Sequence, residues 1–187
     1  MLLNLARTLR RSTANGPGER FVVWVQGCPL ACPGCWNPDT WSFARRESRE
    51  ADSLVGEMLG VNGIEGVTFT GGEPFAQARA LAEVAARLQG AGLSVVVFTG
   101  YEMDELAGAD ARSLLTHTDL LVAGRYVQGE REAGLPLRGS RNQRLHFLSG
   151  RYGPIDVIDA PDAEIHLAPD GVVTVTGFPC SSLLDSG

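Results

Sequence analysis

Residues 20–35 read RFVVWVQGCPLACPGC, and the rest of the chain can be interpreted outward from them. Residues 20–26 form a β-branched and aromatic run closed by Gly27, a pattern typical of a buried strand that feeds a loop. The loop holds Cys28, Cys32 and Cys35 in a C-x3-C-x2-C spacing. Because so short a loop can aim three thiolates at one inorganic centre, the stretch predicts a metal or cluster site at the end of a strand.

Strands and helices are expected to alternate after this loop. We predict strands at 67–70, 94–98 and 119–123, helices at 50–59 and 77–89, and short helical pieces at 104–106 and 111–115. The helix at 50–59 is indicated by Leu54, Val55, Met58 and Leu59, which are apolar and recur at helical spacing. This order favours parallel βαβ units, in which functional groups collect at the carboxyl ends of the strands.

The end of the chain follows a different pattern. Residues 164–168 and 172–176 flank Pro169, Asp170 and Gly171, a turn sequence typical of an antiparallel hairpin. The Gly- and Pro-containing stretch at 149–154 is expected to separate this hairpin from the rest. We therefore predict a core domain at residues 1–148 and a C-terminal extension with a β-hairpin at residues 149–187.

The composition indicates a single folded domain with a sizeable core. The 187 residues are 44% apolar and 20% charged, unlike a disordered chain. Every one of the 16 basic residues is an arginine, which excludes Schiff-base chemistry on a lysine. With 22 acidic residues the net charge is -6 and no basic stripe occurs, so nucleic acid is not an expected partner.

The apolar and cysteine patterns predict a cytoplasmic protein with no membrane partner. No apolar stretch approaches the roughly 18 residues that span a bilayer. Arg7, Arg10 and Arg11 follow the apolar start instead of preceding it, the reverse of a secretory signal. Three of the four cysteines cluster, which suggests metal ligands more than disulfides.

Three cysteine ligands leave one coordination position open. An iron–sulfur cubane is normally held by four thiolates, so a cubane with three protein ligands has one iron available to a small molecule. The alternative is a closed zinc site, completed by Cys180 or by one of His117, His146 and His166. The three histidines form no ligand spacing of their own.

A second motif, residues 70–74 with the sequence TGGEP, directly follows the strand predicted at 67–70. Gly71 and Gly72 let the backbone approach a ligand closely, and Glu73 offers a carboxylate to an ammonium group held against the cluster. An ordinary turn between strand and helix is the alternative. Together with the three cysteines, the motif favours a small molecule bound beside the inorganic centre.

These residues resemble the radical S-adenosylmethionine (SAM) enzymes, and among them the glycyl-radical activating enzymes. The matching stretches occur in the family's order: 15–20, 27–35 with Asn37 and Trp41, 71–75, 99–101 with 104–106, 121–122, and 138–143. Many radical SAM enzymes carry an aromatic residue just before the third cysteine, whereas this chain has Gly34 there and Trp36 after it. No counterpart of the hairpin extension is known to us in the compact activating enzymes.

The resemblance implies an incomplete (β/α) barrel with two cofactors. A [4Fe-4S] cluster would be held by Cys28, Cys32 and Cys35, and its open iron would bind the amino and carboxylate groups of SAM. The cofactor-binding residues would be Gly71, Gly72, Glu73, Pro74, Thr99 and Tyr101, with Tyr101 as a flat surface for adenine or, alternatively, a packed aromatic. A reduced cluster then gives one electron to the sulfonium, which releases methionine and a 5'-deoxyadenosyl radical.

The resemblance also implies the partners. In the activating enzymes that radical takes a hydrogen atom from a glycine on a large reductase, and here the expected target is an anaerobic ribonucleotide reductase. Asn15, Gly16 and Arg20 lie in the segment that would sit near the docked glycyl loop. An external donor such as flavodoxin or ferredoxin would supply the electron. The alternatives are a related radical SAM enzyme acting on another protein, peptide or metabolite, and a metal-stabilised interaction module.

Overall fold

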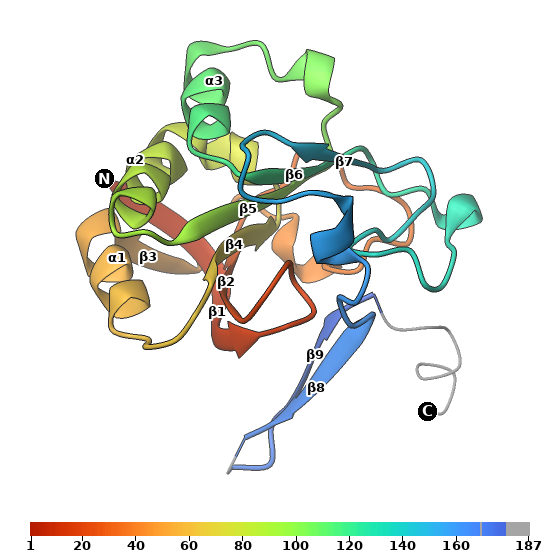
Figure 1. The fold of residues 1–187 in the computed structure, drawn as a ribbon, viewed down its shortest axis with the longest axis horizontal. Helices are drawn as coiled ribbons and strands as arrows, with labels where there is room; N and C mark the ends of the chain where they lie inside the picture. The colour runs from red at the N-terminus through yellow and green to blue at the C-terminus, as the bar shows by residue number, and fades with distance from the viewer. Residues whose placement is uncertain (169, 179–187) are drawn as a thin grey trace.

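The parallel strands expected from the sequence form the centre of the fold. The computed structural model describes residues 1–168 and 170–178. Its main sheet has the strand order β3-β1-β2-β4-β5-β6-β7 (Figure 1). The four central strands, β2 (Arg20–Val25), β4 (Gly66–Gly71), β5 (Ser94–Thr99) and β6 (Leu120–Ala123), run parallel to one another. The fold is therefore of the α/β class.

Three further strands were not predicted, and all of them pair antiparallel at the margins of the sheet. They are β1 (Leu2–Ser12), β3 (Glu47–Glu50) and β7 (Arg144–Phe147). β3 reads ESRE and β1 contains several arginines, so neither shows the apolar alternation that signals a strand. At such positions the hydrogen bonds to a neighbouring strand outweigh local propensity.

Three α-helices cover one face of the sheet (Figure 1). They are α1 (Ala51–Leu59), α2 (Ala78–Gly90) and α3 (Ala109–Thr116), close to their predicted ranges. Short 3-10 turns occupy Pro38–Thr40, Pro74–Gln77, Met103–Glu105, Gln128–Glu130 and Pro154–Val157. Of the apolar residues at helical spacing in α1, Leu54, Val55 and Met58 are buried, whereas Leu59 at the last turn is 45% exposed.

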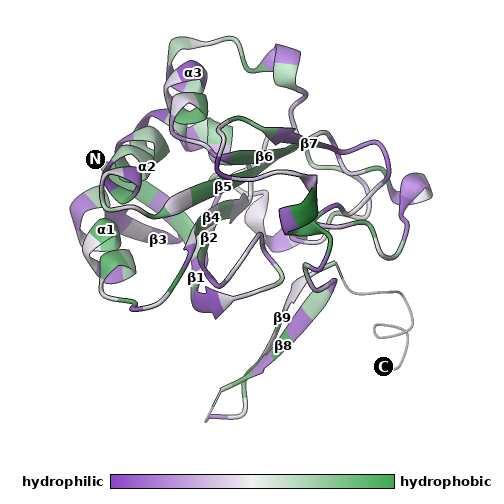
Figure 2. Ribbon diagram, viewed as in Figure 1, coloured by the Kyte–Doolittle hydropathy of each residue, from purple (hydrophilic) through white to green (hydrophobic). Residues whose placement is uncertain are grey.

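Alternate residues of the parallel strands point toward the helices or away from them. Figure 2 shows the most hydrophobic residues gathered on the central strands between the two faces. The side turned away from the helices, which we call the inner face, carries three rows that cross the strands. The rows are Arg20, Gly66 and Ser94, then Val22, Thr68, Val96 and Leu120, and last Trp24, Thr70, Phe98 and Val122 at the carboxyl ends.

The C-terminal extension carries a second, two-stranded sheet. β8 (Ala163–Leu167) and β9 (Val173–Gly177) pair antiparallel, with Ile165 opposite Val175. Asp170 and Gly171 lie in the turn, while the predicted turn residue Pro169 lies outside the described residues. The stretch at 149–154 is fastened to the core, because Arg151 donates to Glu65 and to the carbonyl of Gly92. Within residues 1–168 and 170–178, no helix has both the length and the hydropathy needed to cross a membrane.

Candidate functional site

The cysteine loop leaves the carboxyl end of β2 and is held in place by its own backbone. The amides of Gly27 and Cys28 donate to the carbonyls of Thr40 and Trp41, at 2.8 and 3.0 Å. Ala31 adopts a left-handed φ of 44°, which is strained for a residue with a side chain. All three cysteines of the loop are free, half-buried thiols that line one pocket, which we call the cluster pocket. Burial raises the pKa of the Cys28 thiol, because it disfavours the thiolate.

The glycine turn after β4 packs directly on this loop. The amide of Gly72 donates to Val25 and that of Glu73 donates to Gly27, both at 2.8 Å. A Cβ atom at Gly72 would lie 2.4 Å from the Gly27 carbonyl oxygen, so only glycine permits this approach. Gly71, Gly72 and Glu73 line the cluster pocket with the cysteines. The two motifs that the sequence placed after neighbouring strands thus form one site.

Glu73 makes hydrogen bonds within the protein that the sequence did not predict. Its side chain is only 1% exposed, and both carboxylate oxygens already accept hydrogen bonds from the protein. The donors are the Thr99 hydroxyl at 2.8 Å and the amides of Phe75 and Gly100, each at 2.9 Å. The carboxylate therefore joins the turns after β4 and β5. Because Glu73 also lines the cluster pocket, a contact with a ligand ammonium stays a prediction. Burial raises its pKa to about 7, although the three donors oppose the shift.

Replacing Glu73 with glutamine is expected to change how stability depends on pH. The carboxyl pKa is about 7 in the folded protein against 4.5 without its surroundings. Between these values the folded chain keeps the proton that the unfolded chain has lost, so the free energy of unfolding falls as pH rises, by about 3 kcal/mol. Glu73→Gln removes this fall. Urea unfolding of the cluster-free protein at about pH 5 and about pH 7.5 measures it.

Glu83→Gln serves as the matched control, since Glu83 is exposed on α2. It should keep the pH dependence of the natural chain. Equal pH dependence in Glu73→Gln and in the natural chain would contradict the account of this carboxyl group.

Only some of the residues predicted in the turn after β5 line the cluster pocket. Thr99 and Gly100 line the cluster pocket. Tyr101 does not line it; its ring packs against the core on the helix side of the sheet, with the Arg125 guanidinium 5.8 Å from the ring centre. This packing matches the alternative of a packed aromatic, and the adenine surface at Tyr101 stays a prediction. Arg125 pairs through two hydrogen bonds with Glu105, and this pairing lowers the pKa of Glu105 to about 2.

The zinc alternative finds no support in the described residues. Nowhere in residues 1–168 and 170–178 do three or more His, Cys, Asp or Glu side chains surround a point that would suit one metal ion. His117 bonds Gln89, His146 lies on β7 and His166 lies beside Glu164 on the hairpin. Cys180 lies outside the described residues.

One further observation of the pocket fits a cluster with sulfur acceptors. The indole nitrogen of Trp41 is a buried donor that lines this pocket and has no hydrogen-bond partner within the described residues. A buried donor without an acceptor is costly, and it is explained where a group absent from the protein itself supplies one. In addition, the Asn37 amide donates to the Cys35 sulfur at 3.4 Å. Donors of this kind are the usual means of tuning a cluster potential.

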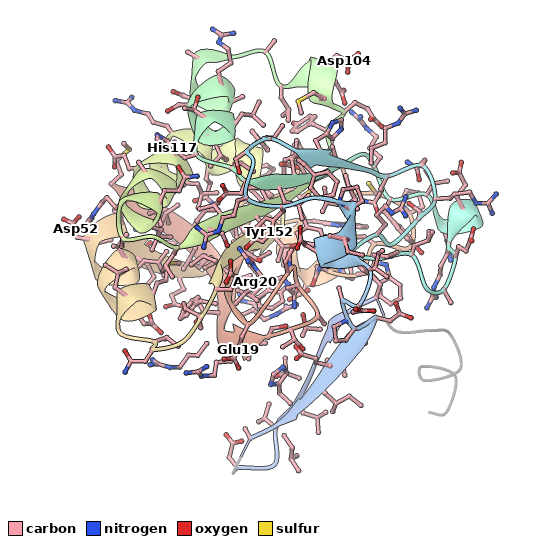
Figure 3. The ribbon with its side chains drawn as sticks, in the orientation of Figure 1. Glu19, Arg20, Asp52, Asp104, His117 and Tyr152 are labelled. Atoms are coloured by element: carbon pink, nitrogen blue, oxygen red, sulfur yellow. The ribbon has the colours of Figure 1, made fainter. Side chains whose placement is uncertain are left out.

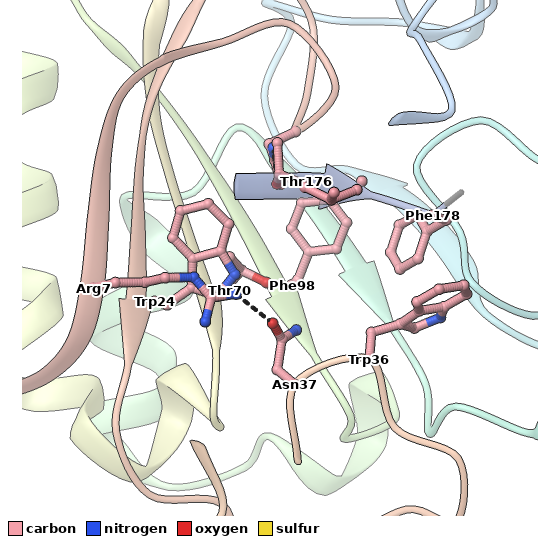
Figure 4. Close-up of a pocket in the computed structure, with 11 residues that line it drawn as sticks. Arg7, Trp24, Trp36, Asn37, Thr70, Phe98, Thr176 and Phe178 are labelled. Atoms are coloured by element: carbon pink, nitrogen blue, oxygen red, sulfur yellow. Dashed lines mark hydrogen bonds between the residues drawn. The ribbon is translucent and has the colours of Figure 1, made fainter. Parts of the chain in front are cut away.

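A second hollow adjoins the cluster pocket, and we call it the side cavity (Figure 4). It has a volume of about 260 Å³, against about 100 Å³ for the cluster pocket. The two share the side chains of Trp36, Asn37, Thr70, Phe98 and Phe178. Ligand sites usually measure roughly 300–1,000 Å³, so the two hollows reach that range only as one continuous site.

Arg7 orders the opposite wall of the side cavity. Its guanidinium lies 4.6 Å from the centre of the Trp24 ring, and it donates to the Asn37 side-chain oxygen at 2.7 Å, the dashed line in Figure 4. Sequence reasoning missed Trp24 and Phe98 as site residues, and it included Thr70 only as the first residue of the TGGEP motif. The strand alternation was the available signal, because these are the last inner-face residues of β2, β5 and β4.

The residues predicted to contact a partner are less accessible than expected. Arg20 is fully buried beside Tyr152 (Figure 3), and its guanidinium makes six hydrogen bonds. The prediction that Arg20 contacts a partner is therefore wrong. Gly16 is covered by this arginine, since a Cβ there would lie 2.7 Å from Arg20 Cδ. Asn15, 6% exposed, lines the side cavity, and contact with a partner there stays a prediction.

Comparison with known proteins identifies the family. The family described as "4Fe-4S single cluster domain" matches residues 14–146. The anaerobic ribonucleoside-triphosphate reductase-activating protein of Vibrio cholerae is 33% identical over 140 residues, 71% of this chain and 90% of the relative. Its Escherichia coli counterpart is 32% identical over 145 residues, 72% of this chain and 92% of the relative. The pyruvate formate-lyase-activating enzyme of Listeria monocytogenes is 37% identical over 90 residues, 46% and 36% of the two chains.

Fold, site and relatives together define a radical SAM enzyme with a [4Fe-4S] cluster and SAM as cofactors. Within that class, the chain belongs to the family of the anaerobic ribonucleoside-triphosphate reductase-activating proteins. A solved structure titled "Crystal structure of QueE from Escherichia coli" aligns over 54% of this chain and 53% of that one, at 19% identity and a TM-score of 0.45. The family match ends at residue 146, so the hairpin extension lies outside it.

Proposed function

We propose that this protein installs a glycyl radical on an anaerobic ribonucleotide reductase. The observation that carries the proposal is the single pocket in which three cysteines and the glycine turn after β4 meet, in a chain that matches activating proteins over most of their length. The sheet, with β3 and β7 at its two ends, suits an incomplete (β/α) barrel whose inner face holds the site.

The cluster would be held by Cys28, Cys32 and Cys35, and the methionine end of SAM by Gly71, Gly72 and Glu73, with Thr99 beside them. Pro74 is buried at the start of the following 3-10 turn and would fix the course of this segment. Bound together, the cluster and SAM supply reductive cleavage of the sulfonium and a carbon-centred radical able to take a hydrogen atom. The protein supplies orientation and exclusion of water. Glu73 keeps the two turns in register, and the Gly72 backbone approaches where a side chain would block it.

The side cavity suits a segment of polypeptide as substrate. Its walls combine aromatic rings with the amide groups of Asn15 and Asn37 and the hydroxyls of Thr70 and Thr176. Amides and hydroxyls match the N–H and C=O groups of a peptide backbone. Aromatic walls leave little room for a bulky side chain, which favours a glycine at the reacting position.

The remaining assignments follow from this function. We place the core at residues 1–148 and treat residues 149–187 as an extension of it. The free thiols of the described cysteines accord with the cytoplasm, where disulfides are rare. A flavodoxin or ferredoxin would deliver the electron, since the described residues offer one cluster site.

The proposal is tested by anaerobic turnover. The protein is reconstituted with iron and sulfide, reduced, mixed with SAM, and assayed for 5'-deoxyadenosine with and without the reductase. We expect product, with stimulation by the reductase and a glycyl radical in its paramagnetic resonance spectrum. A loaded cluster that yields no product under any of these conditions would refute the proposal.

A second candidate is a related enzyme that acts on a different peptide or protein. The observation that favours it is the extension, which lies outside the family match and yet lines the side cavity with Thr176 and Phe178. In the same assay this candidate predicts 5'-deoxyadenosine without stimulation by the reductase and without a glycyl signal.

A further inference from the structure

The hairpin extension is bound to the core next to the side cavity. Glu164 of β8 accepts a hydrogen bond from the hydroxyl of Ser12, and from the amide and hydroxyl of Thr13 at 2.8 and 2.6 Å. Thr176 of β9 is buried and accepts from the Asn15 amide at 2.8 Å. These contacts join the hairpin to the end of β1 and to the turn that follows it. The position of β9 over the cavity in Figure 4 is therefore fixed by polar bonds.

Phe178, the residue after β9, stands at the junction of the two hollows. Its ring lies 6.0 Å from that of Trp36, edge to face, and 6.2 Å from that of Phe98. Trp36 directly follows the cluster ligand Cys35, and Phe98 is the last inner-face residue of β5. The Phe178 ring is thus packed between the cysteine loop and the sheet, and it borders both the cluster pocket and the side cavity.

Gly139 leaves the space that this aromatic contact needs. A Cβ atom there would lie 3.0 Å from the Trp36 indole nitrogen and 3.1 Å from two carbons of the Phe178 ring. The segment is anchored beside the site, because Gln143 accepts from the Gly139 amide at 2.8 Å and itself lines the cluster pocket. The sequence indicated no role for residues 138–143. In the structure this segment packs against the Phe178 ring and helps to hold it in place.

We propose that the extension forms one wall of the substrate cavity and that Phe178 is a positioning residue, which holds the substrate segment at the cluster pocket and keeps water from it. This inference rests on the proposed function. The ligand class is a polypeptide segment with small side chains, since the cavity of about 260 Å³ between Trp24, Phe98 and Phe178 has no room for a folded surface. The substrate must then enter as an extended loop.

The test compares full-length Phe178→Ala with Leu167→Ala, a control on the same hairpin whose side chain is 74% exposed. The readout is the number of glycyl radicals formed on the reductase per 5'-deoxyadenosine. We expect roughly a tenfold lower ratio in Phe178→Ala, because a misplaced reacting atom loses rate steeply while SAM cleavage continues. Leu167→Ala should equal the natural chain, and Phe178→Leu should restore most of the ratio. An unchanged ratio in Phe178→Ala overturns the proposal.

A second readout separates this proposal from the proposed function. The loaded cluster is exposed to an iron chelator, and its loss of visible absorbance is followed. Faster bleaching in Phe178→Ala than in Leu167→Ala would support the proposal that Phe178 shields the cluster pocket, even if the reductase gives no glycyl signal. Equal bleaching rates would overturn that proposal. Should Phe178→Ala fail to fold by circular dichroism, Gly139→Ala takes its place, because the added methyl group displaces the same rings.

Discussion

Cys32→Ala is expected to abolish SAM cleavage completely. Cys32 is one of the three cysteines that line the cluster pocket. A cubane held by three thiolates already has one iron without a protein ligand, and loss of Cys32 would leave a second iron without one, so the cluster would not stay bound. The variant should still fold, because Cys32 lies half-buried in a loop and is not part of the hydrophobic core. Iron and sulfide content, visible absorbance and 5'-deoxyadenosine yield measure the effect, with circular dichroism as the check on folding.

Cys180→Ala is the matched control for this experiment. It removes a thiol from the same chain but outside the C-x3-C-x2-C motif, and it should retain the cluster and full turnover. Undiminished turnover in Cys32→Ala would show that the cluster is held elsewhere, and the assignment of the site would be wrong.

Arg20→Met is expected to destabilise the protein by about 3–5 kcal/mol, because several buried acceptors lose their donor at about 1–3 kcal/mol each. The guanidinium has no exposed surface and donates to the Thr68 and Ser94 hydroxyls, the Tyr152 phenol and backbone carbonyls. Gly66 makes room for it, since a Cβ there would lie 2.7 Å from the guanidinium. Methionine fills part of this volume but leaves those acceptors buried and unpaired.

Urea unfolding of Arg20→Met beside Arg79→Met measures this difference. Arg79 is exposed on α2, and its replacement should change the unfolding free energy by less than about 0.5 kcal/mol. Because Arg20 ties the first turn of the chain to β4, β5 and Tyr152 of the extension, its loss should also loosen the extension. Similar stability of the two variants would contradict the structural role given to Arg20.

The sequence was sufficient to locate the centre of the site. Cys28, Gly72 and Thr99 each follow an apolar run, and parallel strands bring such positions to one edge of a sheet. The edge strands β3 and β7 were not predictable, since a segment such as ESRE becomes a strand only because a neighbouring strand offers hydrogen bonds.

Side-chain roles proved harder to predict than positions. Arg20, Glu73 and Tyr101 all lie in motifs that the resemblance marked as functional, yet each side chain turns into the protein. Their orientation depends on which face of a strand or turn is buried, which a motif does not encode. Phe178 was missed for a different reason, since its contacts with Trp36 and Phe98 bridge distant parts of the chain.

The hydrogen atom that the 5'-deoxyadenosyl radical takes from the reductase can be followed by isotope labelling. The reductase is prepared with glycine deuterated at the α carbon, and the natural chain is loaded with its cluster, reduced and given unlabelled SAM. We expect one deuterium in the 5'-deoxyadenosine and a glycyl radical on the reductase. 5'-Deoxyadenosine without deuterium would show that the hydrogen atom came from another donor, and the proposed function would be wrong.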